Sequence, residues 1–173
     1  MDSSERQARA RRTSAAWTAP LVYGAIRGLA RVLLWPYFRT RSVGREHIPS
    51  DGPVILAPVH RSNLDSLMLA PLMRRRLRAL AKESLFTFRP LAWVIASLGG
   101  FPVHRDTADR ESMRIARALL NEGNLLLVFP EGKRHDGDGV GELFDGTAWL
   151  AAKTQSRVVP VGIAGTGEAM PAG

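Results

Sequence analysis

Alternation of short apolar runs with longer helical ones is the feature that most limits how this chain can fold. Five short runs are typical of buried β-strands: 53–58, 79–82, 101–104, 124–129 and 158–163. Four runs with helical spacing lie between them: 65–77, 90–98, 109–121 and 147–154. Strands that alternate with helices predict an α/β fold, with a mixed, largely parallel sheet flanked by helices.

Polar clusters follow three of the expected strands directly. They are 60–65, 104–106 and 131–134. In an open α/β sheet, ligands bind at the carboxyl ends of the strands. We therefore expect the side chains of these clusters to share one edge of the sheet and to form a functional site there.

The first cluster contains an imidazole and a carboxylate five residues apart, His60 and Asp65. Along a regular helix, five residues correspond to a rotation of about 140°, so the two side chains would diverge there. Ser62-x-x-Asp65 fits a capping box, which supplies the turn needed to bring them together. In a first helical turn, the macrodipole also favours an ionised carboxylate.

An ionised carboxylate beside an imidazole fixes its tautomer and stabilises the imidazolium, as a general base requires. Two simpler interpretations stay open, a structural histidine for His60 and a plain helix cap for Asp65. The spacing alone does not choose among them, because His104 and Asp109 repeat it.

The other two clusters are rich in cations. Arg105 follows a short strand that begins after Gly99-Gly100, and a guanidinium there suits a phosphate bound by two hydrogen bonds. The alternative is an ion pair with Asp106 or Asp109. The segment 131–134, Glu-Gly-Lys-Arg, suits a polar substrate with hydroxyls and a phosphate, or else forms a capped surface turn.

Positive charge is concentrated at the N-terminus. The chain has 173 residues and a net charge of +8, and residues 1–45 hold nine arginines against only Asp2 and Glu5. We expect residues 1–14 to be a basic, disordered arm and residues 40–173 to be a single near-neutral domain. Such a distribution favours an anionic partner, either lipid headgroups or nucleic acid.

Residues 15–39 predict an amphipathic helix. Polar or basic side chains recur on one face, and apolar ones lie on another: Tyr23, Arg27 and Arg31 against Val22, Ala25, Leu29 and Val32. Two central arginines leave too short an apolar stretch to span a bilayer. Aromatic residues near both ends suit the water–lipid boundary: Trp17, Trp35 and Tyr37. We expect this helix to lie in one leaflet, the alternative being a helix packed on the domain's own core.

Four sequence blocks appear in order along the chain: His60-x4-Asp65, Gly100 to Arg105, Phe129-Pro130-Glu131-Gly132-x-Arg134, and Val159-Pro160-Val161. In order and spacing they resemble the motifs of the glycerolipid acyltransferase family, and most nearly its bacterial 1-acyl-sn-glycerol-3-phosphate acyltransferases. The segment 81–85, Ala-Lys-Glu-Ser-Leu, also resembles the family's sequence between the first two blocks. Arginine outnumbers lysine by 21 to 3, which favours a bacterial source with a GC-rich genome.

The resemblance implies transfer of an acyl chain from a thioester, acyl-CoA or acyl carrier protein, to the free hydroxyl of lysophosphatidate. It implies that His60 is the general base and that Asp65 orients its ring. Residues expected at the acceptor phosphate are Arg105, Arg134 and Lys82, and those expected at its glycerol are Glu131 and Gly132. The family needs no metal or other cofactor, and this chain, which has no cysteine, offers no metal cluster. The expected place is the cytoplasmic face of the cell membrane, peripherally bound, in phospholipid synthesis.

Two departures from the family pattern affect these expectations. The third block usually reads Glu-Gly-Thr-Arg-Ser, whereas Lys133 and His135 replace the Thr and Ser here. The added charge keeps another lyso-lipid acceptor open. Family members also continue for several tens of residues beyond the fourth block, so closing strands are expected to be missing from the 173 residues.

A non-catalytic basic protein that binds membranes or nucleic acid is the alternative from a different class. The arginines are not interleaved with exposed aromatic residues on a recognisable reader fold, and the main domain is near neutral. The expected partners are therefore a thioester donor, a lyso-lipid acceptor and an anionic membrane surface, and not nucleic acid.

Overall fold

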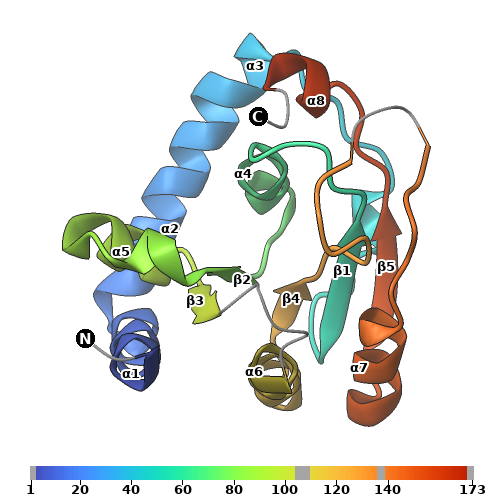
Figure 1. Ribbon diagram of the computed structural model, residues 1–173. Helices are drawn as coiled ribbons and strands as arrows, with labels where there is room; N and C mark the ends of the chain where they lie inside the picture. The colour runs from blue at the N-terminus through green and yellow to red at the C-terminus, as the bar shows by residue number, and fades with distance from the viewer. Residues whose placement is uncertain (1–2, 104–109, 136–138, 171–173) are drawn as a thin grey trace.

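A parallel β-sheet forms the centre of the molecule (Figure 1). The structure is a computed structural model that describes residues 3–103, 110–135 and 139–170. Its strands are β1 (Val54–Pro58), β2 (Leu77–Lys82), β3 (Gly100–Val103), β4 (Leu125–Leu127) and β5 (Arg157–Val161). The order across the sheet is β3-β2-β4-β1-β5, and every neighbouring pair in the described residues is parallel. The predicted α/β fold and all five predicted strands are confirmed.

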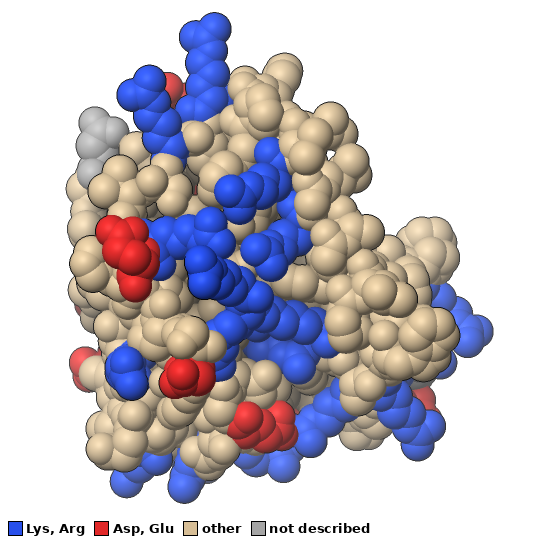
Figure 2. Space-filling view, turned by 180° about the vertical axis from the view of Figure 1, so that it is seen from behind, with Lys and Arg blue, Asp and Glu red and all other residues tan. Residues whose placement is uncertain are grey.

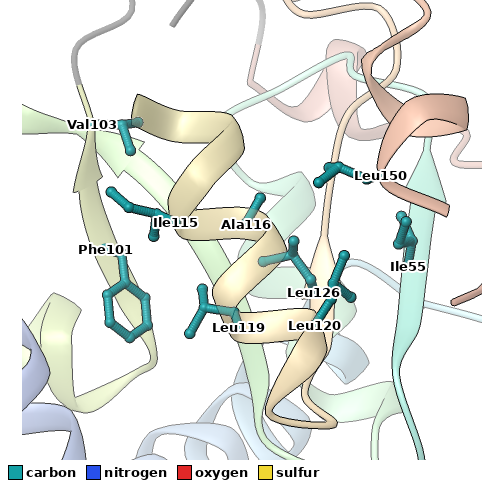
Figure 3. Close-up of a cluster of buried hydrophobic side chains, with 9 residues drawn as sticks. All are labelled: Ile55, Phe101, Val103, Ile115, Ala116, Leu119, Leu120, Leu126 and Leu150. Carbon is teal, nitrogen blue, oxygen red and sulfur yellow. The ribbon is translucent and has the colours of Figure 1, made fainter. Parts of the chain in front are cut away.

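Helices cover both faces of the sheet. On one face lie α6 (Arg110–Asn121) and α7 (Gly146–Thr154), and they enclose the cluster drawn in Figure 3: Ile55, Phe101, Val103, Ile115, Ala116, Leu119, Leu120, Leu126 and Leu150. On the other face, α4 (Asp65–Leu69) contributes to a second cluster: Val54, Leu56, Leu69, Met73, Leu77, Leu125 and Leu127. Successive residues of β1 and β4 join opposite clusters because side chains alternate along a strand. Burial on both faces explains why these strands are continuously apolar.

The helix expected over 65–77 is shorter than predicted. It ends at Leu69, and the chain continues through the 3-10 turn η3 (Ala70–Leu72) and a short non-helical bend before β2. Pro71 explains the interruption, because its ring clashes with the preceding turn and its nitrogen donates no hydrogen bond. The other three expected helices are confirmed as α5 (Arg89–Ser97), α6 and α7.

Residues 3–15 form a helix, α1 (Ser3–Ala15), so the prediction of a disordered arm was wrong for them. Ala10 and Ser14 are buried, and α1 packs against α5 and β3. Arg6 Nη1 lies 2.9 Å from Glu83 Oε1 in the 3-10 helix η4 (Glu83–Phe86). Arg76 donates a 2.7 Å hydrogen bond to the Ser14 carbonyl. Contacts with residues far along the chain therefore stabilise this helix.

The segment expected as an amphipathic helix is helical in three successive pieces. They are α2 (Thr18–Leu29), the π-helical turn η1 (Ala30–Leu34) and α3 (Trp35–Tyr37). Tyr23 is buried, and its hydroxyl accepts a 3.1 Å hydrogen bond from the Leu77 N–H, which fixes α2 to β2. Within the described ranges, no helix has the length and apolar character needed to cross a membrane. The remaining short elements are η2 (Arg45–His47) and α8 (Thr166–Ala169).

Candidate active site

His60 and Asp65 meet at the carboxyl end of β1. His60 Nδ1 lies 2.9 Å from Asp65 Oδ2, and both residues are buried, with 7% and 0% of their surface exposed. An ionised carboxylate only accepts hydrogen bonds, so Nδ1 carries the proton and donates it. In the neutral ring, Nε2 is then left with a free lone pair, as a general base needs.

The turn that brings the two side chains together is close to the one predicted. Asp65 Oδ2 accepts hydrogen bonds from the backbone N–H groups of Arg61 and Ser62, at 2.7 and 2.9 Å. The Ser62 hydroxyl oxygen in turn accepts a 3.2 Å hydrogen bond from the Leu64 N–H. The bond from the Ser62 N–H to Asp65 is one of the two bonds of a capping box, whereas the Ser62 hydroxyl binds the N–H of Leu64 in place of that of Asp65, and α4 itself begins only at Asp65.

Asp65 is held as a carboxylate despite its burial. Burial raises the pKa of Asp65, but hydrogen bonds from the His60 ring and from backbone N–H groups lower it, and the net pKa is below the ordinary 3.8. The Thr166 hydroxyl on α8 acts in the same direction. Asp65 Oδ1 and Thr166 Oγ1 are both buried and form no hydrogen bond of standard geometry with the described residues. Thr166 thus belongs to the surroundings of the pair.

Phe129 fixes the plane of the imidazole. Its ring stacks on that of His60, with centroids 3.7 Å apart and planes at 16°. The stacked ring covers one face of the imidazole and limits its rotation. Sequence reasoning placed Phe129 in a buried strand but gave it no part in the site, because nothing in the apolar run indicated which ring it would meet.

Glu131 connects the third polar cluster to the first. Its Oε2 accepts a 2.6 Å hydrogen bond from the His60 N–H, and its Oε1 accepts one of 2.8 Å from the Gly141 N–H. Burial raises the pKa of Glu131, but these bonds and the Arg61 charge lower it below its ordinary 4.5. The residue is fully buried. Its oxygens are therefore engaged within the protein, which makes Glu131 a positioning residue and gives no support to the expected contact with glycerol.

Arg61 is a further member of the site that the sequence did not single out. Its guanidinium lies 3.6 Å from Glu131 Oε1 and donates hydrogen bonds to the carbonyl oxygens of His135, at 3.3 Å, and Gly139. The His135 N–H also donates a 3.0 Å hydrogen bond to the His60 carbonyl. An arginine in a polar turn ordinarily faces solvent, so the sequence carried no signal for this buried role.

Comparison with known proteins identifies the family. A profile described as acyltransferase matches residues 39–164, most of the chain. The chain belongs to the acyltransferase family. The match includes the whole of the segment from His60 to Glu131 that forms the site.

Several relatives of this acyltransferase are named as acyltransferases that act on 1-acyl-sn-glycerol-3-phosphate. It is 29% identical over 147 residues to the chloroplast 1-acyl-sn-glycerol-3-phosphate acyltransferase of Arabidopsis thaliana, covering 83% of this chain and 41% of that protein. Against the corresponding Chlamydomonas reinhardtii protein, it is 34% identical over 143 residues, covering 80% and 42%. The crystal structure of the 1-acyl-sn-glycerophosphate acyltransferase from Thermotoga maritima superimposes with a TM-score of 0.72 at 26% identity, covering 90% and 64%. The chain thus spans about two fifths of the length of these plant and algal relatives.

The residues expected at the acceptor phosphate are only partly described. Lys82 is exposed at the carboxyl end of β2, on the same edge of the sheet as His60, and Arg134 is half-buried. Neither forms an ion pair within the described part of the acyltransferase. Arg105 lies outside the described residues, as do His104 and Asp109. Gly132 is exposed, with a φ of +66° that favours glycine.

An apolar hollow of about 650 Å³ opens beside Glu131. Its lining comes from the ends of β1 and β5, from the segment after Gly139 and from α7; the larger apolar side chains among them are Val140, Leu143, Phe144, Val158 and Val161. Such a lining suits a hydrocarbon chain more than a charged group. Among the described residues, no three His, Asp or Glu side chains are grouped closely enough to hold a metal ion.

Proposed function

We propose that this chain is an acyltransferase domain that moves an acyl chain from a thioester donor to the free hydroxyl of a lysophosphatidate-type acceptor. The observation that carries the proposal is the buried His60–Asp65 pair at 2.9 Å, placed at the ligand-binding edge of a parallel sheet. The names of the relatives support the same reaction, since both curated ones are 1-acyl-sn-glycerol-3-phosphate acyltransferases.

In the proposed mechanism, His60 acts directly on the acceptor. Nε2 takes the proton of the hydroxyl as its oxygen attacks the thioester carbonyl, and Asp65 stabilises the imidazolium that forms. Collapse of the tetrahedral intermediate breaks the C–S bond, leaves the new C–O ester bond, and returns the proton to the departing thiolate. General-base catalysis is typically worth about 10²–10⁴-fold, so the rest of the acceleration comes from positioning and from stabilisation of the oxyanion.

The substrates are assigned to the two sides of this pair. The apolar hollow beside Glu131 would take the acyl chain of the donor, either acyl-CoA or acyl carrier protein. Lys82, Arg134 and Arg105 would bind the acceptor phosphate, with Gly132 near the glycerol. Lys133, exposed next to Gly132, adds a cation to this side and keeps a different lyso-lipid acceptor as the second candidate.

Membrane association is part of the proposal, because the acceptor is a lipid. The helical segment formed by α2, η1 and α3, together with Trp17 directly before it, exposes six large apolar side chains, with Trp17 80% and Tyr37 79% exposed: Trp17, Leu21, Leu29, Val32, Leu33 and Tyr37. Aromatic residues at the ends of an apolar surface suit a water–lipid boundary. We propose peripheral binding at the cytoplasmic face of the membrane through this segment.

Release of free thiol from a panel of acyl-CoAs and acyl carrier proteins, assayed with several lyso-lipid acceptors, tests the proposed reaction. His60→Ala is expected to lower the acceptor-dependent rate by about 10²–10⁴-fold. His47→Ala is the matched control, since His47 is exposed on η2 and, among the described residues, its side chain bonds only to Gly44 and Glu46. Unchanged thiol release by His60→Ala would show that the base is wrongly assigned. Absence of release by the wild type with every donor would favour a non-catalytic protein.

A further inference from the structure

Helix α5 buries small side chains and leaves two large apolar side chains exposed. It buries small residues, Ala92, Ala96 and Ser97, against α1, α2 and β3. Two of its large apolar side chains are left partly exposed, Leu91 at 41% and Trp93 at 47%, while Ile95 packs against the buried cluster that includes Ala92 and Ala96. A helix at the surface of a water-soluble protein normally turns its large apolar side chains to the core. Leu91 and Trp93 are two positions apart and so lie on different sides of α5, and each leaves an apolar side chain open to the surroundings.

The preceding turn η4 extends this surface. Leu85 is 43% exposed, and Phe88, directly before α5, is 65% exposed. Four large apolar side chains thus lie open within nine residues: Leu85, Phe88, Leu91 and Trp93. Single exposed apolar residues are ordinary, whereas several in one short segment are typical of an interaction site.

Continuity with α2 indicates what this surface contacts. Helices α2 and α5 pack together, and α2 buries Ala19 and Tyr23 while exposing Leu21 and Leu29. The two outward faces belong to adjacent elements. A partner that covers the α2 segment can therefore reach the η4–α5 surface as well.

Charge next to α5 favours anionic lipid as that partner. Arg9 and Arg89 line, together with Trp93, a hollow of about 170 Å³ between α1 and α5. Figure 2 shows basic side chains gathered in a band across the back of the molecule, with few acidic ones among them. Cations beside tryptophan and phenylalanine suit lipid phosphates above an acyl boundary.

We propose that η4 and α5 form a second membrane-contact surface, which binds an anionic lipid bilayer together with the α2–α3 segment. The inference rests on the membrane association proposed above and assigns it to additional residues. Because η4 begins where β2 ends, this surface lies at the edge of the sheet that carries Lys82 and His60. Contact there brings the bilayer to the catalytic edge, so that a lyso-lipid reaches His60 without leaving the membrane.

Vesicle binding by full-length variants tests the surface. Wild type is expected to co-sediment with phosphatidylglycerol vesicles more than with phosphatidylcholine vesicles. Phe88→Ser/Trp93→Ser, which changes side chains that are 65% and 47% exposed, is expected to weaken this binding about tenfold or more, since two large apolar groups no longer enter the lipid. Val43→Ser/Trp149→Ser is the matched control: Val43 is 99% exposed, and Trp149, at 42%, lies on α7. The control is expected to bind as wild type.

Catalysis gives a second readout, which a loss of stability would not reproduce. Phe88→Ser/Trp93→Ser is expected to slow transfer to a lyso-lipid held in vesicles about tenfold, and to leave transfer to a water-soluble, short-chain acceptor unchanged. Gel filtration of wild type and variant, without lipid, checks whether the same face joins two copies of the chain.

Each outcome decides the proposal. Suppose that Phe88→Ser/Trp93→Ser binds vesicles as well as wild type does, while Leu21→Ser/Val32→Ser no longer binds them. This result overturns the η4–α5 surface and leaves membrane association through α2 standing. A dimer that only Phe88→Ser/Trp93→Ser dissociates assigns the face to self-association and also overturns it. Failure of wild type to bind any vesicle refutes membrane association itself, independently of the acyl-transfer reaction.

Discussion

The backbone N–H of His60 donates a 2.6 Å hydrogen bond to the carboxylate of Glu131, 71 residues further along the chain. This bond joins the segment after β1 to the segment after β4, two strands that are neighbours in the sheet. The opposite oxygen of Glu131 binds the Gly141 N–H, so a single buried carboxylate fixes both the main chain of the base and the loop beside it. The position of the imidazole is thus set from its backbone as well as from Asp65.

Glu131→Gln is expected to lower both activity and stability. The substituted amide has one acceptor oxygen where the carboxylate has two, so either the His60 or the Gly141 N–H faces an amide NH₂ group. An unsatisfied buried donor costs about 1–3 kcal/mol, and kcat is expected to fall about 10–100-fold as His60 shifts. Urea unfolding and thiol-release kinetics measure the two effects. Glu46→Gln, at an exposed glutamate of η2, is the control; equal behaviour of both variants would contradict the role given to Glu131.

Asp65→Asn tests the charge of the pair with little change of shape. The amide cannot stabilise an imidazolium, and its NH₂ group favours the wrong tautomer of His60. We expect kcat to fall by about 10²–10⁴-fold, with KM little changed. Steady-state kinetics at fixed pH gives both constants. Asp51→Asn serves as control because Asp51 is exposed and its carboxylate accepts a hydrogen bond from Ser50 beside it. A kcat within a few-fold of wild type would argue against a general base oriented by Asp65.

The parts of the fold that the sequence predicted are those set by local patterns. The five residues of β1 are all buried, and such burial produces the apolar run by which the strand was recognised. The turn from Ser62 to Asp65 was readable because its bonds join residues three apart. Pro71 also carried a readable signal, and the overlong helix prediction at 65–77 did not take account of it.

The parts that escaped prediction depend on contacts between distant residues. Helix α1 is secured by Glu83, which is 77 residues from Arg6, and by Arg76, which is 62 residues from Ser14. A basic, polar sequence alone gave no indication of these partners. Glu131 was read as facing substrate because it lies among glycine and cations. Its actual partner, the His60 N–H, became available only through the pairing of β4 with β1.

Acid is expected to destabilise the protein through two buried carboxylates. The folded-state pKa values of Asp65 and Glu131 lie below their ordinary 3.8 and 4.5, so the unfolded chain binds protons at higher pH than the folded one. The stability that these two carboxylates contribute is therefore complete at pH values above their ordinary pKa values. It is lost as the pH falls through their folded-state pKa values. Each carboxylate adds at most about 1.4 kcal/mol per pH unit to the slope of the free energy of unfolding against pH. Urea unfolding between pH 6 and pH 3, in roughly half-unit steps, measures it.

The variants identify which carboxylates are responsible. Asp65→Asn/Glu131→Gln is expected to be less stable at neutral pH and to show a shallower loss of stability in acid, because neither substituted side chain titrates. Asp51→Asn/Glu46→Gln, at exposed positions, is expected to keep the wild-type slope. An unchanged slope in the first double variant would assign acid unfolding to other groups.

Thr166→Val tests whether α8 supports the catalytic pair. Valine keeps the shape of threonine and removes the hydroxyl that lowers the pKa of Asp65. Without it, the pKa of Asp65 rises, so the acid-induced loss of stability is expected to begin at higher pH and kcat to fall about 3–10-fold. Thr166→Ser restores a hydroxyl and is expected to recover most of both. Thr154→Val, which removes a hydroxyl bonded to the Leu150 carbonyl in α7, controls for stability alone. A pH dependence of stability that is unchanged in Thr166→Val would show that Thr166 only packs against the site.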